Sequence, residues 1–194
     1  MFSKGLILAS TSPYRRALLG RLGLPFECVA PGADEARLPG ETAKLMATRL
    51  ARLKAEAVAA RHPGAVVIGS DQVALRGEDV LGKPGTVDRC REQLQASSGR
   101  EVVFLTAVHL IDGTAGRTES HVDRTVVQFR ELTDAEIERY IALDNPLDCA
   151  GGFKAEALGI ALFEHIVADD PTGLTGLPLA WVAGALRRAG FAVP

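Results

Sequence analysis

An α/β domain with a mixed central sheet is the fold that the sequence predicts, and three features of the chain indicate it. Apolar strand-like runs alternate with helical patterns along most of the 194 residues. The pair Asp112-Gly113 lies between two long strand-like segments and is a typical hairpin signal. Helical crossovers join parallel strands and hairpins join antiparallel ones, so both together predict a mixed sheet. The length suits one domain over residues 1–194, with one or two lobes.

The first half of the chain predicts strand–helix units with clear helix starts. Leu6–Ala9 is a short apolar run, and Ser12 followed by Pro13 is typical of a helix N-terminus. The longest helical pattern stops at a His-Pro-Gly sequence. We expect helices over residues 13–22 and 42–61, and strands over residues 6–9, 26–30 and 65–69, the last continuing extended to residue 75.

The second half predicts the hairpin and three more helices. Thr86 is the expected cap of a helix that ends near Gly99, and Thr133 with Glu136 has the capping-box pattern. We expect strands over residues 102–111, over a return segment ending near 129, and over 160–167, and the last two helices over residues 134–144 and 178–189.

Composition and charge exclude several classes of protein. Hydrophobic residues make up 47% and charged residues 24%, which is ordinary for a globular protein. The net charge of −2 argues against a broad basic surface for nucleic acid. No apolar stretch approaches the roughly 18 residues that a membrane span needs. The three cysteines are scattered, without disulfide or zinc spacing, so we expect reduced thiols and a cytoplasmic protein.

Two segments at strand ends are candidates for phosphate and metal chemistry. The chain contains neither GxGxxG nor GxxxxGK[ST], so phosphates must be bound in another way. Ser10, Ser12 and Arg15 lie where a strand meets a helix N-terminus, whose free N–H groups attract anions. Asp71 ends a buried strand, where α/β proteins usually bind ligands, and could hold a divalent cation or activate water. A helix cap and a turn aspartate are the plainer alternatives.

Three other places could contribute charge to the same chemistry. Lys83 precedes a proline that restricts its backbone, and it could serve as a point charge for phosphate. Glu35 lies in a loop and Lys54 on the long helix; a carboxylate there could complete a metal site with the strand-end acid. Glu156 follows a glycine pair that permits close backbone approach, and it could accept hydrogen bonds from a base. Alone, each is also compatible with a solvated side chain.

Taken in order, these segments resemble the Maf family of nucleotide pyrophosphatases over nearly the whole chain. No single piece is decisive, but the ordered set is specific. The matching pieces are Leu-Ala-Ser-x-Ser-Pro-x-Arg-Arg from Leu8, Asp34-Glu35, Leu50-Ala51-x-x-Lys54-Ala55, Gly69-Ser70-Asp71-Gln72-Val73, Gly82-Lys83-Pro84, Ser98-Gly99, Ala150-Gly151-x-Phe153 and Gly176-Leu177-Pro178.

The resemblance implies a fold, a reaction and a set of site residues. It implies an elongated, two-lobed fold like that of inosine triphosphatase, with a cleft between the lobes. It also implies hydrolysis of the α–β phosphoanhydride bond with a divalent metal, Mg²⁺ or Mn²⁺, and release of pyrophosphate. The implied catalytic residues are Asp71, Glu35, Lys54 and Lys83, with Asp71 and Glu35 as metal ligands. The implied phosphate-binding residues are Ser10, Ser12 and Arg15.

Three departures from the commonest family pattern concern the base. Tyr14 stands at the first arginine position of the opening motif, Gln72 where threonine is common, and Glu156 where many members have glutamine. Together they are similar to the subgroup that hydrolyses 7-methyl-GTP rather than dTTP and UTP. A cationic methylated ring favours stacking on Tyr14, and its N–H donors suit a carboxylate such as Glu156.

Two other functions remain as alternatives at this point. A pyrophosphatase for canonical pyrimidine triphosphates would share the reaction but not the base. A non-catalytic regulator of cell division would need neither Asp71 nor the two lysines. The expected partner in the main hypothesis is a small nucleotide, without nucleic acid or membrane, and a homodimer is compatible with it.

Overall fold

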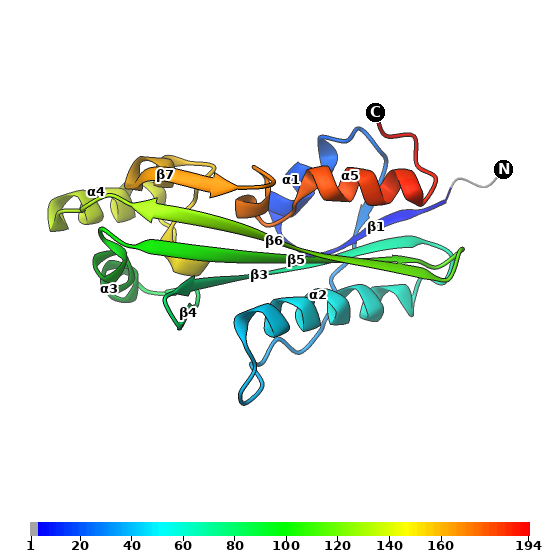
Figure 1. Ribbon diagram of the computed structural model, residues 1–194, viewed down its shortest axis with the longest axis horizontal. Coiled ribbons are helices and arrows are strands. Elements are labelled where there is room, and N and C mark those ends of the chain that lie inside the picture. Colours follow the sequence, from blue (N-terminus) through cyan, green and yellow to red (C-terminus); the bar gives the residue numbers. More distant parts are fainter. Residues whose placement is uncertain (1–3) are drawn as a thin grey trace. The chain divides into compact units, whose positions relative to one another are not determined.

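A mixed sheet organises the fold in the computed structural model, which describes residues 4–194 (Figure 1). Its strand order is β2-β1-β3-β5-β6-β7, with β4 paired to β3. The strands are β1 (Leu6–Ala9), β2 (Glu27–Cys28), β3 (Val66–Arg76), β4 (Asp79–Leu81), β5 (Glu101–Asp112), β6 (Arg117–Phe129) and β7 (Phe163–Ala168). Because β1 pairs in parallel with β2 and β3, and β3–β4 and β6–β7 pair antiparallel, the predicted α/β class with a mixed sheet is confirmed.

The helices begin at the caps that the sequence indicates. They are α1 (Pro13–Gly20), α2 (Ala43–Ala59), α3 (Val87–Ser97), α4 (Asp134–Asp144) and α5 (Leu179–Arg188), with short 3-10 turns η1 (Ala150–Gly152), η2 (Leu158–Leu162) and η3 (Gly173–Thr175). The Ser12 hydroxyl accepts from the N–H of Arg15, which satisfies one of the free donors of α1. Thr133 and Glu136 form the expected capping box at α4. None of the described helices is long and apolar enough to cross a membrane.

Two predicted strands are shorter than expected, and one strand of the structure was not predicted. The strand expected over 26–30 is only Glu27–Cys28, where two residues pair with β1 between flanking prolines at 25 and 31. The strand expected over 160–167 begins at Phe163, because the preceding residues form η2. The unpredicted β4 folds back on β3 through a turn at Gly77, whose φ is +60°. A strand this short has no readable hydrophobic period.

The chain divides into two compact units. The first consists of residues up to 72, 106–123 and 170–194, and the second of residues 73–105 and 124–169. Strands β3, β5 and β6 contribute residues to both. The second unit contains a cluster of edge-to-face aromatic rings with centroids 4.9–5.5 Å apart. Its members are Phe104, Phe129, Phe153 and Phe163.

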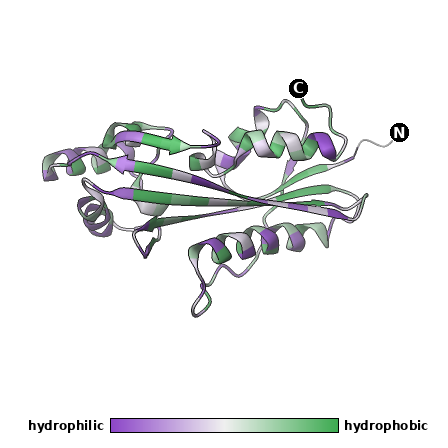
Figure 2. Cartoon of the chain, viewed as in Figure 1, coloured by the Kyte–Doolittle hydropathy of each residue, from purple (hydrophilic) through white to green (hydrophobic). Residues whose placement is uncertain are grey.

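In the first unit the sheet separates two apolar clusters, because alternate side chains of β1 belong to different clusters. Leu6 and Leu8 pack with residues of α1 and α5, whereas Ile7 and Ala9 pack with residues of α2. Figure 1 shows α2 on one side of the strands and α1 and α5 on the other. Figure 2 shows hydrophobic residues following β1 and β3, while α2 alternates between hydrophobic and hydrophilic positions. The sheet is therefore covered on both faces in this unit, and polar groups inside it need partners.

Candidate active site

Strand β3 carries consecutive polar side chains that contact opposite faces of the sheet. Asp71 contacts α2, where its Oδ1 lies 2.7 Å from Nζ of Lys54. Ser70 and Gln72 contact β5 and the segment around η3 instead. Successive side chains of a strand point to opposite faces, so this separation follows directly from the order Ser-Asp-Gln. Strand β3 thereby contributes polar side chains to both faces of the sheet in the first unit.

Lys54 holds two carboxylates together. Its Nζ lies 2.7 Å from Oδ1 of Asp71 and 3.0 Å from Oε1 of Glu35. Lys54 and Asp71 are 5% and 6% exposed, so both charges are almost removed from water. Glu35 keeps 58% of its side chain exposed. A buried charge needs a partner, and this geometry supplies one for both members of the buried pair. The structure thus brings together three of the four residues expected to be catalytic.

The approach of α2 to β3 depends on Gly69. A Cβ at this position would lie 2.2 Å from the backbone oxygen of Ala51 and 2.6 Å from the nitrogen of Ala55. Both contacts are shorter than any real Cβ contact, and both involve helix backbone that cannot turn aside. Glycine within a strand is a known signal of close backbone approach. Gly69 belongs to the Gly69-Ser70-Asp71-Gln72-Val73 motif, but the sequence alone does not predict this packing contact.

The charges around Asp71 oppose the effect of its burial. Burial raises the pKa of the Asp71 carboxyl above its usual range, and the neighbouring Lys54 and Arg15 charges pull it back down. Burial likewise lowers the pKa of the Arg15 guanidinium, while the Asp71 and Glu35 charges raise it. Arg15 stays protonated at any pH of interest. Two carboxylates and two cations therefore interact where water is largely excluded. They are Asp71, Glu35, Lys54 and Arg15.

Arg15 is aimed by the segment after η3. Its Nε donates to the carbonyl oxygen of Gly176 at 2.9 Å. The preceding loop is shaped by its own hydroxyls, since the N–H of Ser12 donates to Oγ of Ser10 at 3.1 Å and Oγ of Ser12 accepts from the N–H of Arg15. Ser10 is buried and Ser12 half-buried, and half-buried Tyr14 lies in the first turn of α1. The predicted phosphate-binding residues thus adjoin one helix N-terminus, where an anion is favoured.

Arg49 of α2 holds the loop that carries Glu35 through hydrogen bonds, and the sequence alone does not predict these contacts. The guanidinium of Arg49 makes a bidentate pair with Glu41, with Nε 2.6 Å from Oε1 and a terminal nitrogen 2.7 Å from Oε2. The same guanidinium also donates to the carbonyl oxygen of Ala36 at 3.0 Å. The hydrogen bond to Arg49 holds the pKa of Glu41 below its usual range. An Arg–Glu pair eight residues apart has no helical spacing that could have revealed it.

Two predicted residues belong to the second unit. Lys83 and Glu156 are both exposed. The N–H of Gly151 donates to the carbonyl of Gly82 at 3.4 Å, so the segments before these two residues are hydrogen-bonded to each other. Gly151 has a φ of +80°, which only glycine adopts readily. The predicted role of the glycine pair, which is to permit close backbone approach to a ligand, stays a prediction.

The donor set of Asp71 and Glu35 fits a hard divalent cation that also binds substrate. Among residues 4–194, no group of three or more His, Cys, Asp or Glu side chains could hold a metal ion. Two carboxylates linked through one lysine are nevertheless available. Mg²⁺ is commonly bound by one or two carboxylates, with water and substrate phosphates completing its shell. The residues present therefore suit a cation that arrives with a triphosphate better than a permanently bound one.

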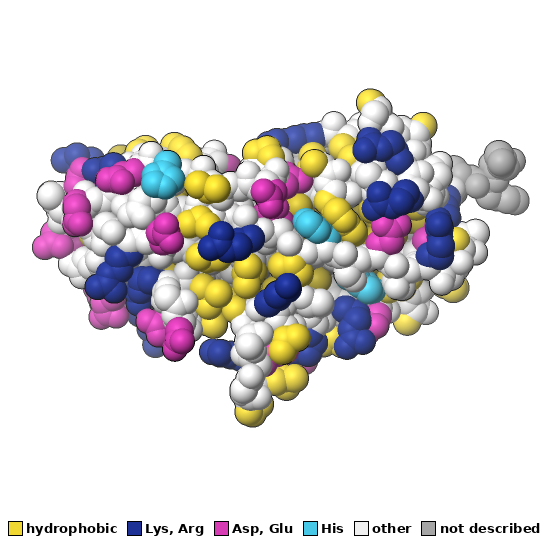
Figure 3. Space-filling model, viewed as in Figure 1, with side chains coloured by type: hydrophobic (Ala, Val, Ile, Leu, Met, Phe, Trp, Pro, Cys, Tyr) yellow, Lys and Arg dark blue, Asp and Glu magenta, His cyan; other side chains and the backbone are white. Residues whose placement is uncertain are grey.

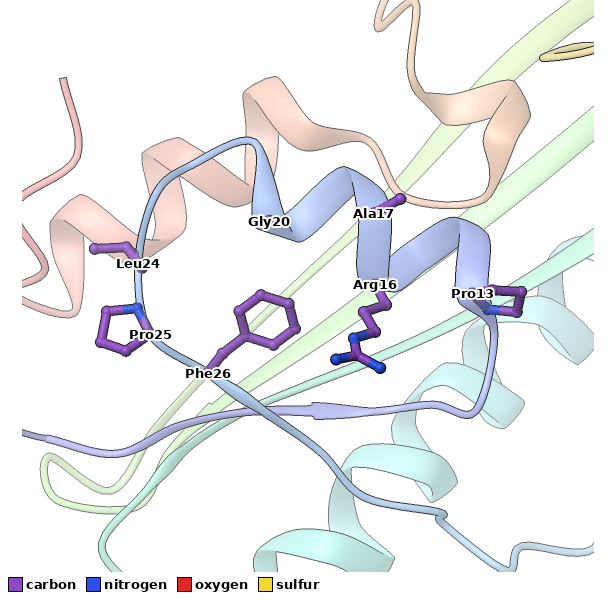
Figure 4. A pocket seen from close by; sticks show the side chains of 7 residues that line it. All are labelled: Pro13, Arg16, Ala17, Gly20, Leu24, Pro25 and Phe26. Atoms are coloured by element: carbon purple, nitrogen blue, oxygen red, sulfur yellow. The ribbon is translucent and has the colours of Figure 1, made fainter.

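A cavity of about 510 Å³ lies elsewhere, beside α1 (Figure 4). Figure 4 shows Arg16 and the Phe26 ring pointing into the space between α1 and residues 24–26. The lining residues are Pro13, Arg16, Ala17, Gly20, Leu24, Pro25 and Phe26. None of them belongs to the carboxylate–lysine cluster, which consists of Glu35, Lys54 and Asp71. Charged side chains of both signs are interspersed over the face drawn in Figure 3.

Three similar relatives carry the name 7-methyl-GTP pyrophosphatase. That of Xanthomonas campestris pv. campestris (strain 8004) is 57% identical over 97% of this chain and 98% of its own. That of Cupriavidus metallidurans is 51% identical over 96% and 94%, and that of Pseudomonas syringae pv. tomato 49% over 97% and 98%. The solved structure of the Staphylococcus aureus Ham1 protein is 17% identical with a TM-score of 0.44, over 66% of this chain and 73% of that one.

The family itself follows from a match over almost the full length. The family described as Maf-like protein matches residues 5–189. The matched region includes every residue of the carboxylate–lysine cluster, the loop at the start of α1 and the segment after η3. This chain belongs to the Maf family.

Proposed function

We propose that this protein is a nucleotide pyrophosphatase that hydrolyses 7-methyl-GTP to 7-methyl-GMP and pyrophosphate, and so clears a modified nucleotide. The observation that carries the proposal is the buried Lys54, held between Asp71 and Glu35 with Arg15 electrostatically coupled to both acids. The relatives' shared name supplies the substrate. The cytoplasm is the proposed setting, because the three cysteines of the described chain are free thiols.

The proposed reaction consumes one water and breaks the α–β phosphoanhydride bond. A triphosphate is strongly anionic, so binding needs cations, and Arg15, Lys54 and Lys83 are the proposed sources. Asp71 is proposed to take a proton from the attacking water or to hold a cation beside it. A raised pKa favours the first role, because the best base titrates near the working pH.

Asp71 and Glu35 would hold the proposed Mg²⁺ or Mn²⁺. When bound, such a cation neutralises charge on the phosphate oxygens. Ser10 and Ser12 shape the loop at the start of α1, so that its N–H groups face an anion.

Removing divalent cations with a chelator should abolish pyrophosphate release, and restoring Mg²⁺ or Mn²⁺ should recover it.

The proposed base site uses Tyr14 for stacking and Glu156 for hydrogen bonds. A 7-methylguanine ring is cationic, and it presents an N–H and an amino group to an acceptor. Uracil and thymine present an N–H between two carbonyl oxygens, and these carbonyls would repel a carboxylate. A panel of 7-methyl-GTP, GTP, dTTP and UTP, assayed for pyrophosphate with Mg²⁺, tests the assignment. Preference for UTP would support the pyrimidine alternative, and no pyrophosphate from any nucleotide would support a non-catalytic role.

Replacing Glu156 with glutamine should narrow the preference for 7-methyl-GTP over UTP by about tenfold, because an amide both donates and accepts. The measurement is the ratio of kcat/KM for the two substrates. Glu164→Gln is a matched control, since Glu164 is an exposed glutamate of the same unit. An unchanged ratio in Glu156→Gln would remove Glu156 from the base site without touching the pyrophosphatase assignment.

Replacing Lys54 with methionine should move the acid limb of the kcat/KM profile to higher pH. Lys54 is the strongest influence that lowers the pKa of Asp71, so its loss lets burial raise that pKa further. A base works only when deprotonated, and activity is lost as the pH falls through its pKa. The pH profiles of the parent and of Lys54→Met, measured at saturating Mg²⁺, give the comparison. If the acid limb moves to lower pH or does not move, it does not report the deprotonation of Asp71.

A further inference from the structure

We infer that Lys154 is a positioning residue that holds Glu156 where the base binds, and so sets the preference among bases without contacting the substrate. The inference rests on the proposed function, because it takes Glu156 as a residue that recognises the base. It is carried by the hydrogen bonds of one short turn and of the C-terminal end of α4, all within the second unit.

Glu156 lies in a turn that begins at Lys154. The N–H of Ala157 donates to the carbonyl oxygen of Lys154 at 3.2 Å, which closes the turn around Glu156. The chain then folds back onto Lys154 at Gly159, where a Cβ would lie 2.5 Å from the Lys154 oxygen and 2.9 Å from its nitrogen. The turn is therefore packed against the backbone of Lys154, and the place of Glu156 depends on where Lys154 is held.

Both the side chain and the backbone of Lys154 are anchored to α4. Its Nζ lies 2.7 Å from the carbonyl oxygen of Asp144 and 3.1 Å from that of Asn145. Carbonyls at a helix C-terminus lack partners within the helix, and the negative end of the helix dipole favours a cation there. The backbone N–H of Lys154 donates to the hydroxyl of Tyr140 at 3.0 Å. Tyr140 is buried, so this second anchor is fixed by the core of the unit.

Because the ammonium of Lys154 is bound at α4, it does not neutralise Glu156. In the described part of the chain the Glu156 carboxylate makes no ion pair, although Lys154 is only two residues away. Both charges still act on Cys149: burial and Asp148 raise the pKa of its thiol, Glu156 raises it further, and Lys154 opposes them. An exposed carboxylate without a bound cation suits a cationic base better than a neutral one.

Three possible roles of Lys154 differ in what its loss would change. If Lys154 positions Glu156, its loss narrows the preference for 7-methyl-GTP over UTP and leaves binding of a phosphate chain without a base intact. If Lys154 binds phosphate, its loss weakens binding of that chain instead. If Lys154 acts only through its charge, its loss widens the preference, because the surroundings of the cationic base become more negative.

The test compares the kcat/KM ratio of 7-methyl-GTP to UTP, measured with Mg²⁺, with the binding of inorganic tripolyphosphate measured by calorimetry. Lys154→Met keeps an unbranched side chain and removes its donors, so the ratio should narrow roughly three- to fivefold. Tripolyphosphate binding should not change. Arg139→Met is the matched control, because it removes an exposed cation from the same helix, and it should leave both quantities unchanged.

Two further substitutions separate the anchor from the charge. Tyr140→Phe removes the acceptor of the Lys154 N–H and leaves the lysine charge in place, so it should also narrow the ratio. Lys154→Arg keeps the charge and offers several donors to the two carbonyls, so it should keep most of the parental preference. If Lys154→Met melts far below the parent, the comparison of Tyr140→Phe with the parent still decides between anchor and charge.

A double substitution tests whether Lys154 acts through Glu156. In a Glu156→Gln background, Lys154→Met should change the ratio little further, because both substitutions affect one carboxylate. If the two effects on the ratio simply add, Lys154 acts by another route and the inference is wrong.

Three other results would overturn the inference. They are an unchanged or widened ratio in Lys154→Met and Tyr140→Phe, weaker tripolyphosphate binding in Lys154→Met, and an unchanged ratio in Glu156→Gln. A parent protein that prefers UTP would instead contradict the proposed substrate, and the double substitution would still decide the role of Lys154. If the parent released no pyrophosphate from any nucleotide, the proposed reaction would fail, and calorimetric binding of 7-methyl-GMP and UMP would replace the kinetic ratio.

Discussion

Replacing Asp71 with asparagine should lower turnover by about 100-fold or more while the protein stays folded. Asparagine has nearly the same size but cannot accept a proton or neutralise a cation, and losing a general base typically costs 10²–10⁴-fold. The substitution also leaves the buried Lys54 with Glu35 as its remaining acidic partner. It therefore removes the charge of Asp71 and weakens the pairing of Lys54 as well. The measurement is kcat for pyrophosphate release at saturating substrate and Mg²⁺.

The shape of the pH profile adds a second readout to the same substitution. Since burial raises the pKa of Asp71, the acid limb of the parent should lie above the ordinary aspartate value of about 4. Asp71→Asn should remove that limb as well as most of the rate. Asp169→Asn, at an exposed aspartate, is the control and should leave both unchanged. Near-normal turnover in a folded Asp71→Asn protein would exclude Asp71 as base and as essential ligand.

Replacing Gly69 with alanine should be nearly as damaging, through packing rather than chemistry. One methyl group would meet the backbone of Ala51 at 2.2 Å, so α2 or β3 must move. Overpacking a core typically costs about 1–3 kcal/mol, which lowers the Tm of a protein of this size by roughly 2–4 °C per kcal/mol. Moving α2 also separates Lys54 from Asp71. Activity should therefore fall more than stability alone explains.

Calorimetry and a turnover assay on the same samples give both quantities. Gly64→Ala is the matched control, because a Cβ there meets nothing within 4 Å and the residue lies just before the same strand. It should melt and react like the parent. A Gly69→Ala protein with parental Tm and rate would show that the close approach of α2 is not required.

The elements that the sequence predicts well are those with local chemical signals. Ser12 with Pro13, and Thr133 with Glu136, mark helix starts through side chain–backbone bonds that need no tertiary context. The sequence predicts strand ends less well where the chain turns within a few residues, as at β4 and before β7. A three-residue strand depends on its partner, and that partner is set by the tertiary fold.

Contacts of the candidate site show the same limit. Asp71, Glu35 and Lys54 could be named from their residue types and from family resemblance, but their meeting depends on how closely α2 packs on β3. The Gly173–Gly176 segment carried no chemical signal, since its contribution is made by carbonyl oxygens. Backbone acceptors are identical in every residue, so only the folded structure shows which of them a side chain uses.

The alternating contacts of β3 restrict how this gene can change over time. Ser70 and Gln72 serve one wall while Asp71 serves the other, so gaining or losing a single codon between residues 66 and 70 would exchange the two sets. The acid would then face buried carbonyl oxygens, and the amide would face the lysine. Point substitutions can accumulate around such a strand, but changes of length are confined to the loops that precede and follow it.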